Sequence, residues 1–180
     1  MRKINYLVLA AFMLLCSNAF AQTTIFIKAL DNNGVLLNGG STAVGHTNQI
    51  EAWSYSQGVS AACIPQQTCK ANLSDFAFMM PLNLAAITAR QMLLKGLFLT
   101  SVDVIYHKTG ATFDYYKIHM ENVAITSVQE SGSSEVPSVS VTFSPAKIAW
   151  LYTAQKADGS AGTKTKGGWD MVANIEWNYF

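Results

Sequence analysis

Short segments of β-branched and aromatic residues alternate with turn residues along the chain, and this pattern constrains the fold more than any other feature. Asp31-Asn32-Asn33-Gly34 and Ser131-Gly132-Ser133-Ser134 are turns of this kind. Residues 35–49 and 157–168 are polar and rich in glycine, so they are predicted to be loops. The strands are predicted at residues 24–30, 50–56, 76–80, 98–107, 113–120, 122–130, 138–144, 147–152 and 169–177. Strands at this spacing predict a mainly β domain, either a small β-barrel or a two-sheet sandwich.

One segment alone has a helical period. Asn83 is a suitable N-cap, and Gly96 is well placed just past the end of a helix over residues 84–95. The apolar residues of this segment fall mostly on one side of a helical wheel, as in a helix that packs one face on a core. They are Leu84, Ile87, Ala89, Met92, Leu93 and Leu94. A single flanking α-helix is therefore expected beside the β structure.

The N-terminus has the pattern of a secretory signal peptide. Arg2 and Lys3 are followed by an apolar run and then by Ala19-Phe20-Ala21, which has the small residues that signal peptidase requires. The sequence predicts a signal peptide over residues 1–21, cleavage between Ala21 and Gln22, and one domain over residues 22–180. The apolar run is short for a membrane span, so the mature chain is expected to carry none and to be periplasmic or extracellular.

The charge balance excludes partners that are recognised mainly through charge. The chain has 12 basic and 11 acidic side chains, and only 13% of its residues are charged. Nucleic acid would require a basic patch, and the sequence contains none, so no nucleic-acid partner is expected. A weakly charged surface is compatible with extensive contacts between subunits.

Cys63 and Cys69 are the two cysteines downstream of the signal, in Cys-Ile-Pro-Gln-Gln-Thr-Cys. An even pair of cysteines in an exported chain favours a disulfide, which here would close a short loop. Such a disulfide contributes about 2–3 kcal/mol to folding stability. Metal binding by this pair is the weaker alternative, because no further Cys or His lies close by in the sequence.

No catalytic or cofactor motif appears in the sequence, which contains no phosphate-binding glycine loop, no Gly-x-Ser-x-Gly and no His-Glu-x-x-His. His107 and His119 lie on the arms of a predicted hairpin, where Asp103 or Asp114 could complete a metal site. Packing histidines are the simpler interpretation. We therefore predict no catalytic residue, no cofactor and no metal.

The aromatic residues leave two interpretations open. They could form a platform for carbohydrate, or they could pack the interior and the rims of a barrel. The residues concerned are Trp53, Tyr55, Tyr115, Tyr116, Trp150, Tyr152, Trp169 and Trp177.

Several segments, taken in order, resemble the Hcp family, the haemolysin-coregulated tube proteins of type VI secretion systems. They are Ile50-Glu-Ala-Trp-Ser-Tyr-Ser-Gln-Gly-Val59, the single mid-chain helix, Tyr115-Tyr-Lys-Ile-His-Met-Glu-Asn-Val123, and Ile148-Ala-Trp-Leu-Tyr-Thr-Ala-Gln-Lys-Ala-Asp-Gly159 leading to Gly168-Trp-Asp170. The resemblance covers nearly all of the chain downstream of the signal. It implies a small barrel of two sheets with one flanking helix, assembled as a hexameric ring that can stack into a tube and hold secreted cargo.

Two features depart from the family pattern, since its tube proteins act from the cytoplasm without a cleavable signal and lack the cysteine loop. We therefore expect a non-enzymatic, exported, ring-forming structural or secreted protein whose main partner is itself. The alternatives are a monomeric binding module for glycan or peptide and a secreted effector on the same fold.

Overall fold

The computed structural model describes residues 23–63, 70–108, 112–132 and 135–180. The chain is mainly β with one described helix, α2, over Leu84–Lys95. The strands are β1 Thr23–Leu30, β2 Ile50–Ala52, β3 Ser54–Ser56, β4 Val59–Ala62, β5 Lys70–Leu73, β6 Phe76–Pro81, β7 Phe98–Lys108, β8 Asp114–Ser131, β9 Ser138–Gln155, β10 Ala161–Asp170 and β11 Ile175–Glu176.

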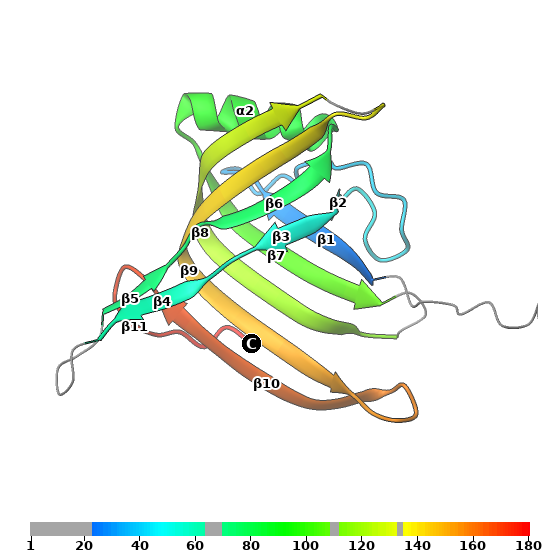
Figure 1. The fold of residues 1–180 in the computed structure, drawn as a ribbon, viewed down its shortest axis with the longest axis vertical. Coiled ribbons are helices and arrows are strands. Elements are labelled where there is room, and N and C mark those ends of the chain that lie inside the picture. Colours follow the sequence, from blue (N-terminus) through cyan, green and yellow to red (C-terminus); the bar gives the residue numbers. More distant parts are fainter. Residues whose placement is uncertain (1–22, 64–69, 109–111, 133–134) are drawn as a thin grey trace, which may run out of the picture.

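The main sheet curls round on itself (Figure 1). The strands of this sheet follow the order β2-β1-β7-β8-β9-β10-β11, and each neighbouring pair is antiparallel. Near its beginning β9 also pairs with β6, and β6 pairs with β3, which directly follows β2 in the chain. The pairings therefore lead from β2 round through β9 and β6 to β3, as expected for the predicted barrel-like, two-layered fold.

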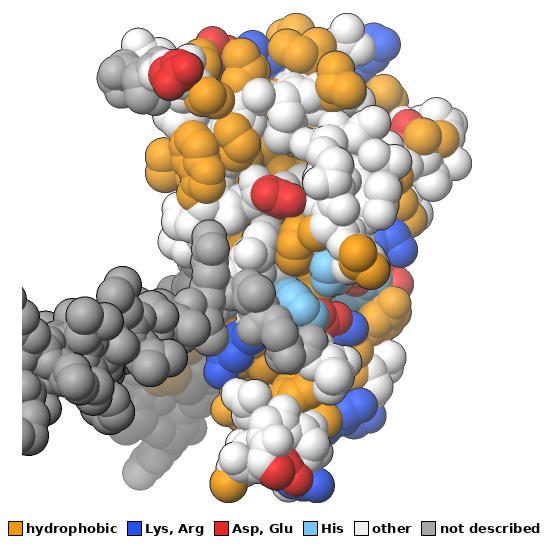
Figure 2. All heavy atoms as spheres, turned by 90° about the vertical axis from the view of Figure 1, so that its right-hand side faces the viewer, with side chains coloured by type: hydrophobic (Ala, Val, Ile, Leu, Met, Phe, Trp, Pro, Cys, Tyr) orange, Lys and Arg blue, Asp and Glu red, His pale blue; other side chains and the backbone are white. Residues whose placement is uncertain are grey.

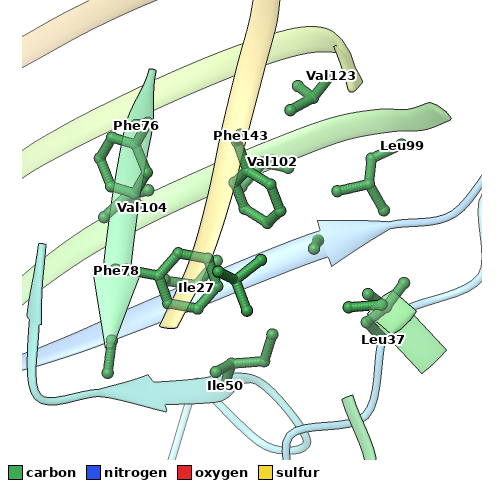
Figure 3. Close-up of a cluster of buried hydrophobic side chains, with 14 of the residues drawn as sticks. Ile27, Leu37, Ile50, Phe76, Phe78, Leu99, Val102, Val104, Val123 and Phe143 are labelled. Atoms are coloured by element: carbon green, nitrogen blue, oxygen red, sulfur yellow. The ribbon is translucent and has the colours of Figure 1, made fainter. Parts of the chain in front are cut away.

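The core fills the inside of this curl. Along β6 and the first half of β9, buried residues alternate with more exposed ones, which is the pattern of sheets with one buried face. In β1, Phe26 of the outer face is buried as well, because His46 stacks on it. Phe76, Phe78 and Phe143 are the largest fully buried side chains, and the rings of Phe78 and Phe143 lie 5.1 Å apart. Figure 3 shows them with Ile27 and Ile50, so β1, β2, β6 and β9 contribute to one continuous core.

The two ends of α2 lie where the sequence predicts them. The Asn83 side chain accepts a hydrogen bond from the Ala86 N–H, and Gly96 adopts the left-handed conformation with φ 64°. The Gly96 and Leu97 N–H groups donate to the carbonyls of Leu93 and Met92. Both caps satisfy backbone groups that a helix end leaves free, which explains why this segment ends at both predicted points.

The face of α2 that meets the sheet matches the prediction only in part, since Ala89 and Met92 are buried and Leu93 packs on the core as predicted. The buried helix residues are Ala85, Ala86, Ala89 and Met92. Leu84, Ile87 and Leu94, which the wheel placed with the apolar side, are 67%, 48% and 87% exposed. Three of the four buried residues are small alanines, and these three larger apolar side chains are left on the outer side of the helix.

The structure corrects four points of the strand prediction. Residues 161–170 form β10 instead of a loop, and the last strand, β11, is only two residues long. The arms of the cysteine loop form a β4–β5 hairpin that was not predicted. The pairs of strands predicted at 113–130 and at 138–152 are single 18-residue strands, β8 and β9, bent by a bulge between Ile125 and Ser127.

Candidate functional site

The outer face of the main sheet carries two separate histidine–aspartate pairs. Asp103 lies opposite His119 across β7 and β8, with Asp103 Oδ1 2.5 Å from His119 Nδ1. His107 lies opposite Asp114, with His107 Nδ1 2.9 Å from Asp114 Oδ1. The structure therefore pairs each histidine with its own aspartate and does not unite the two histidines in one site.

A β-bulge creates the second pair. Tyr106 faces Tyr116, but the next residue, His107, faces Asp114, so Tyr115 is skipped in the register. Residues directly opposite each other in an antiparallel pair point to the same side of the sheet. The bulge therefore turns Asp114 onto the face of His107, as bulges beside functional sites often do.

His46 joins this pair from the loop between β1 and β2. Its ring stacks on Phe26 at 4.0 Å with an interplanar angle of 1°, and its centroid lies 5.4 Å from that of His107. Its Nε2 lies 3.9 Å from Asp114 Oδ1. Figure 2 shows histidine and acidic side chains side by side on this flank of the molecule.

Hydrogen bonds inside the loop hold His46 in place. Nδ1 of His46 lies 3.1 Å from Gln49 Oε1, and the Gln49 N–H donates to the His46 carbonyl. Asn48, with φ 62°, donates its N–H to the Ser41 carbonyl and so folds the loop back. The Ser41 hydroxyl lies 2.6 Å from Glu51 Oε1 of β2. These bonds fix the loop, and with it the imidazole, against the sheet.

Asp114 is ionised in this cluster. Burial raises the pKa of its carboxyl, but the hydrogen bonds from Lys117 and His107 together outweigh burial and bring the pKa below its ordinary value. Lys117 Nζ lies 2.9 Å from Oδ2, while Oδ1 faces the two histidines. The carboxylate thus presents one oxygen to Lys117 and the other to His46 and His107.

The second pair is covered by the end of the chain. Tyr179 stacks on His119 at 3.6 Å and 5°, and the Trp177 ring lies 5.9 Å from it. The Nε2 atom of His119 is buried, has no hydrogen-bond partner among the described residues, and lies 3.7 Å from Glu121 Oε1. Because aromatic rings cover it, this pair is a packed part of the sheet surface and offers no open site.

A second kind of surface surrounds α2. We call Leu84, Ile87, Leu94 and Phe98 the α2 surface; Phe98, the first residue of β7, is 59% exposed. Leu84, Ile87, Gln91 and Leu94 are spaced as one stripe along the helix, and all are exposed. Hydrophobic side chains gather at the top of Figure 2, where α2 lies in Figure 1. An apolar stripe on the solvent side of a helix is a surface suited to covering by another chain.

The aromatic residues do not form one platform. Tyr55, Tyr106, Tyr115 and Tyr116 form one cluster, in which burial and the neighbouring tyrosines raise the pKa of Tyr55. Trp177 covers His119, and Trp53 is 56% exposed.

Trp150 and Trp169 line a separate pocket of about 210 Å³ with Val59, Leu73 and Met171. The pocket lies between the β4–β5 hairpin and the strands β9 and β10. The Trp169 Nε1–H is buried, and no hydrogen-bond acceptor for it lies in the part of the chain that the structure describes.

The remaining predicted residues lie at the limits of the described chain. Cys63 follows β4, while Cys69 lies outside the described residues, so the disulfide stays a prediction. Ala21, Gln22 and the whole predicted signal peptide also lie outside them. Among the described residues, no helix is long and apolar enough to cross a membrane.

Comparisons with known proteins agree on one family. The family model described as type VI secretion system effector, Hcp, matches residues 26–152. A sequence comparison with the curated proteins gives no match.

Solved structures match over nearly the whole described chain. Hcp1 from Salmonella typhimurium is 20% identical with a TM-score of 0.72, and the match covers 86% of this chain and 99% of that one. A type VI secretion system effector from Yersinia pestis is 26% identical with a TM-score of 0.66, covering 81% and 98%. A further type six secretion system protein reaches a TM-score of 0.78 at 23% identity, covering 87% and 100%.

Proposed function

The chain belongs to the Hcp family of type VI secretion system effectors, and from that membership we propose that it is a non-enzymatic structural protein that assembles into hexameric rings. Its main partner is then a second copy of itself, and secreted cargo is a further partner of the assembled ring. The family match covers β1 through most of β9, which includes α2 and the whole core.

The α2 surface is the observation that carries this proposal. A monomer gains nothing by exposing Leu84 and Leu94 to water, whereas a copy that covers them recovers their burial energy. Leucine contributes about 1.5–3 kcal/mol when it is fully buried. Because few side chains of this chain are charged, copies can approach this surface with little electrostatic cost. Repetition of one contact around a closed ring gives a defined assembly without a ligand.

The assembly is tested by the mass of the purified, untagged protein in solution. Light scattering on a sizing column, over a range of concentrations, is expected to give six times the chain mass, and negative-stain images are expected to show rings. A monomer at the highest concentration reached would refute ring formation and leave the fold assignment intact.

We also propose that the ring works outside the cytoplasm and contains the Cys63–Cys69 disulfide. The N-terminal pattern and the even cysteine pair support this. Mass spectrometry of the exported protein is expected to find Gln22 at the N-terminus and both thiols protected from alkylation until a reductant is added. A chain that keeps residues 1–21 would contradict the cleaved signal peptide. Thiols that react before a reductant is added would contradict the disulfide.

The Trp150–Trp169 pocket supports a second candidate function, the binding of an apolar ligand such as a hydrophobic peptide side chain. Its lining is almost wholly apolar, which suits a hydrocarbon side chain better than a glycan. Tryptophan fluorescence titrated with hydrophobic peptides tests it. A wild-type signal that does not change, or that changes equally after Val59→Trp fills the pocket, would exclude it.

A further inference from the structure

We propose that His46, His107 and Asp114 form a binding site for one divalent transition-metal ion, such as zinc, that fastens the β1–β2 loop to the outer face of the sheet. The site does not depend on ring assembly, because all three residues belong to one chain. It differs from the sequence prediction, which expected no metal and considered only His107 and His119 as a histidine pair.

The donor atoms already converge. One ligand atom from each of the three residues lies within 4.8 Å of the other two. Zinc bonds of about 2.0–2.2 Å in a tetrahedron place ligand atoms about 3.4 Å apart. The atoms therefore need to move by little more than 1 Å. The His107 side chain is 28% exposed, which leaves it room to turn.

The hydrogen-bonding pattern leaves a lone pair pointing at a carboxylate. The amide oxygen of Gln49 can only accept, so His46 Nδ1 carries the hydrogen of their 3.1 Å bond. In the neutral ring the lone pair is then on His46 Nε2, which lies 3.9 Å from Asp114 Oδ1. A proton or a metal ion can bridge this nitrogen and the carboxylate, and the convergence of His107 on the same place favours the metal ion.

The surroundings match those of metal-binding histidines. The bond to Gln49 fixes the ring and leaves the metal-binding nitrogen free, as outer partners do in known sites. Phe26 stacks on the same ring, and the His46 residue is only 8% exposed, so water competes weakly there. Lys117 holds Asp114 Oδ2, which leaves Oδ1 for the ion.

The donor set selects the class of ion. Two imidazoles and one carboxylate suit zinc and similar transition metals, whereas calcium and magnesium prefer oxygen ligands. Three protein ligands leave a further position for water. Binding displaces the hydrogen that His107 Nδ1 shares with Asp114, because a ligand nitrogen must be unprotonated.

The ion would connect parts of the chain that are far apart in sequence. His46 lies in the loop, whereas His107 ends β7 and Asp114 begins β8. Val44, two residues before His46, is 98% exposed at the loop surface. A metal at His46 would therefore fix the position of the most exposed apolar side chain of this loop.

The test uses the untagged full-length protein, stripped of metal with EDTA and titrated with zinc chloride by calorimetry. We expect one zinc per chain. His46→Gln and His107→Gln are expected to weaken zinc binding by about 100-fold or more, because removing a ligand should cost at least as much as removing one of its outer partners. His119→Gln is the matched control, since it removes a histidine of the other pair, and it is expected to bind zinc like the wild type. Magnesium is expected to give no heat.

Two measurements on the wild type decide the question even if the variants fail to fold. Cobalt is expected to produce the strong visible absorption of a low-coordinate histidine–carboxylate site. Zinc is expected to slow amide hydrogen exchange in residues 41–49 at least tenfold. Absent zinc uptake, absent cobalt absorption, or equal loss of zinc in His119→Gln and His107→Gln would overturn the proposal.

Discussion

Replacement of Leu94 by alanine separates the assembly of this protein from its folding. Leu94 is 87% exposed, so the single chain buries little of its side chain. The substitution removes three carbon atoms, each worth about 0.8 kcal/mol on complete burial, so about 2 kcal/mol remains available to a covering copy. A loss of that size weakens each subunit contact about 30-fold, since 1.4 kcal/mol corresponds to a factor of ten. The stability of the single chain should change by less than about 0.5 kcal/mol, because alanine also favours the helix.

Two control substitutions accompany Leu94→Ala, one at an exposed residue away from α2 and one in the core. Val172→Ala removes apolar surface that is 82% exposed in the turn after β10, and it is expected to leave assembly unchanged. Leu99→Ala removes a side chain that is fully buried in the core, and it is expected to cost about 2–5 kcal/mol of folding stability.

Light scattering across a dilution series measures the assembly, and urea denaturation measures folding. The reasoning fails if Leu94→Ala assembles at the same concentration as the wild type, or if Val172→Ala weakens assembly as much. It also fails if the wild type stays monomeric throughout.

Three further substitutions test the packing of the single chain by urea denaturation. Gly168→Ala places a Cβ 2.4 Å from the Trp177 carbonyl oxygen and is expected to cost about 1–3 kcal/mol. Gly167→Ala meets nothing within 4 Å and is its control, so equal effects would contradict the steric argument. Phe143→Ala is expected to cost about 3–5 kcal/mol, because the ring is 1% exposed; a loss below about 1 kcal/mol would mean that the core is not packed as described. Asn83→Ala removes the N-cap of α2 and is expected to cost about 1 kcal/mol of folding stability. Asn83→Asp keeps the accepting oxygen and is expected to keep this stability.

The elements that the sequence predicts correctly are those whose signals are local. The Asn83 and Gly96 caps fix the ends of α2, because each acts on backbone groups within one helical turn. The first strand also has clear limits, since it is rich in β-branched and aromatic residues and the turn residues from Asp31 on follow it.

The missed elements depend on distant partners. β10 is rich in Gly, Lys and Thr and has no apolar alternation, so only its pairing with β9 makes it a strand. β8 and β9 continue through sequence that looks like a break, because each is held by the other along most of its length.

The metal site is hidden from the sequence for the same reason. His46 is far from His107 in the chain, and nothing local indicates that the loop folds back onto the sheet. His107 and Asp114 lie opposite each other only because a β-bulge at Tyr115 shifts the register by one residue. Counting along a regular hairpin would therefore place Tyr115, and not Asp114, opposite His107.

The orientation of α2 provides the strongest link between fold and function. A helix of a monomer usually turns its large apolar side chains inward, because their burial gives more energy than that of alanine. Here Ala85, Ala86 and Ala89 face the sheet, while Leu84 and Leu94 face outward. Turning the helix by about half a turn would bury the leucines, but it would also move Met92 and the three alanines out of their places in the core. The chain therefore keeps apolar area that its own fold cannot cover. In the proposed ring a second copy of the chain would cover it without any further partner, which is why assembly explains this helix better than a monomeric binding role does.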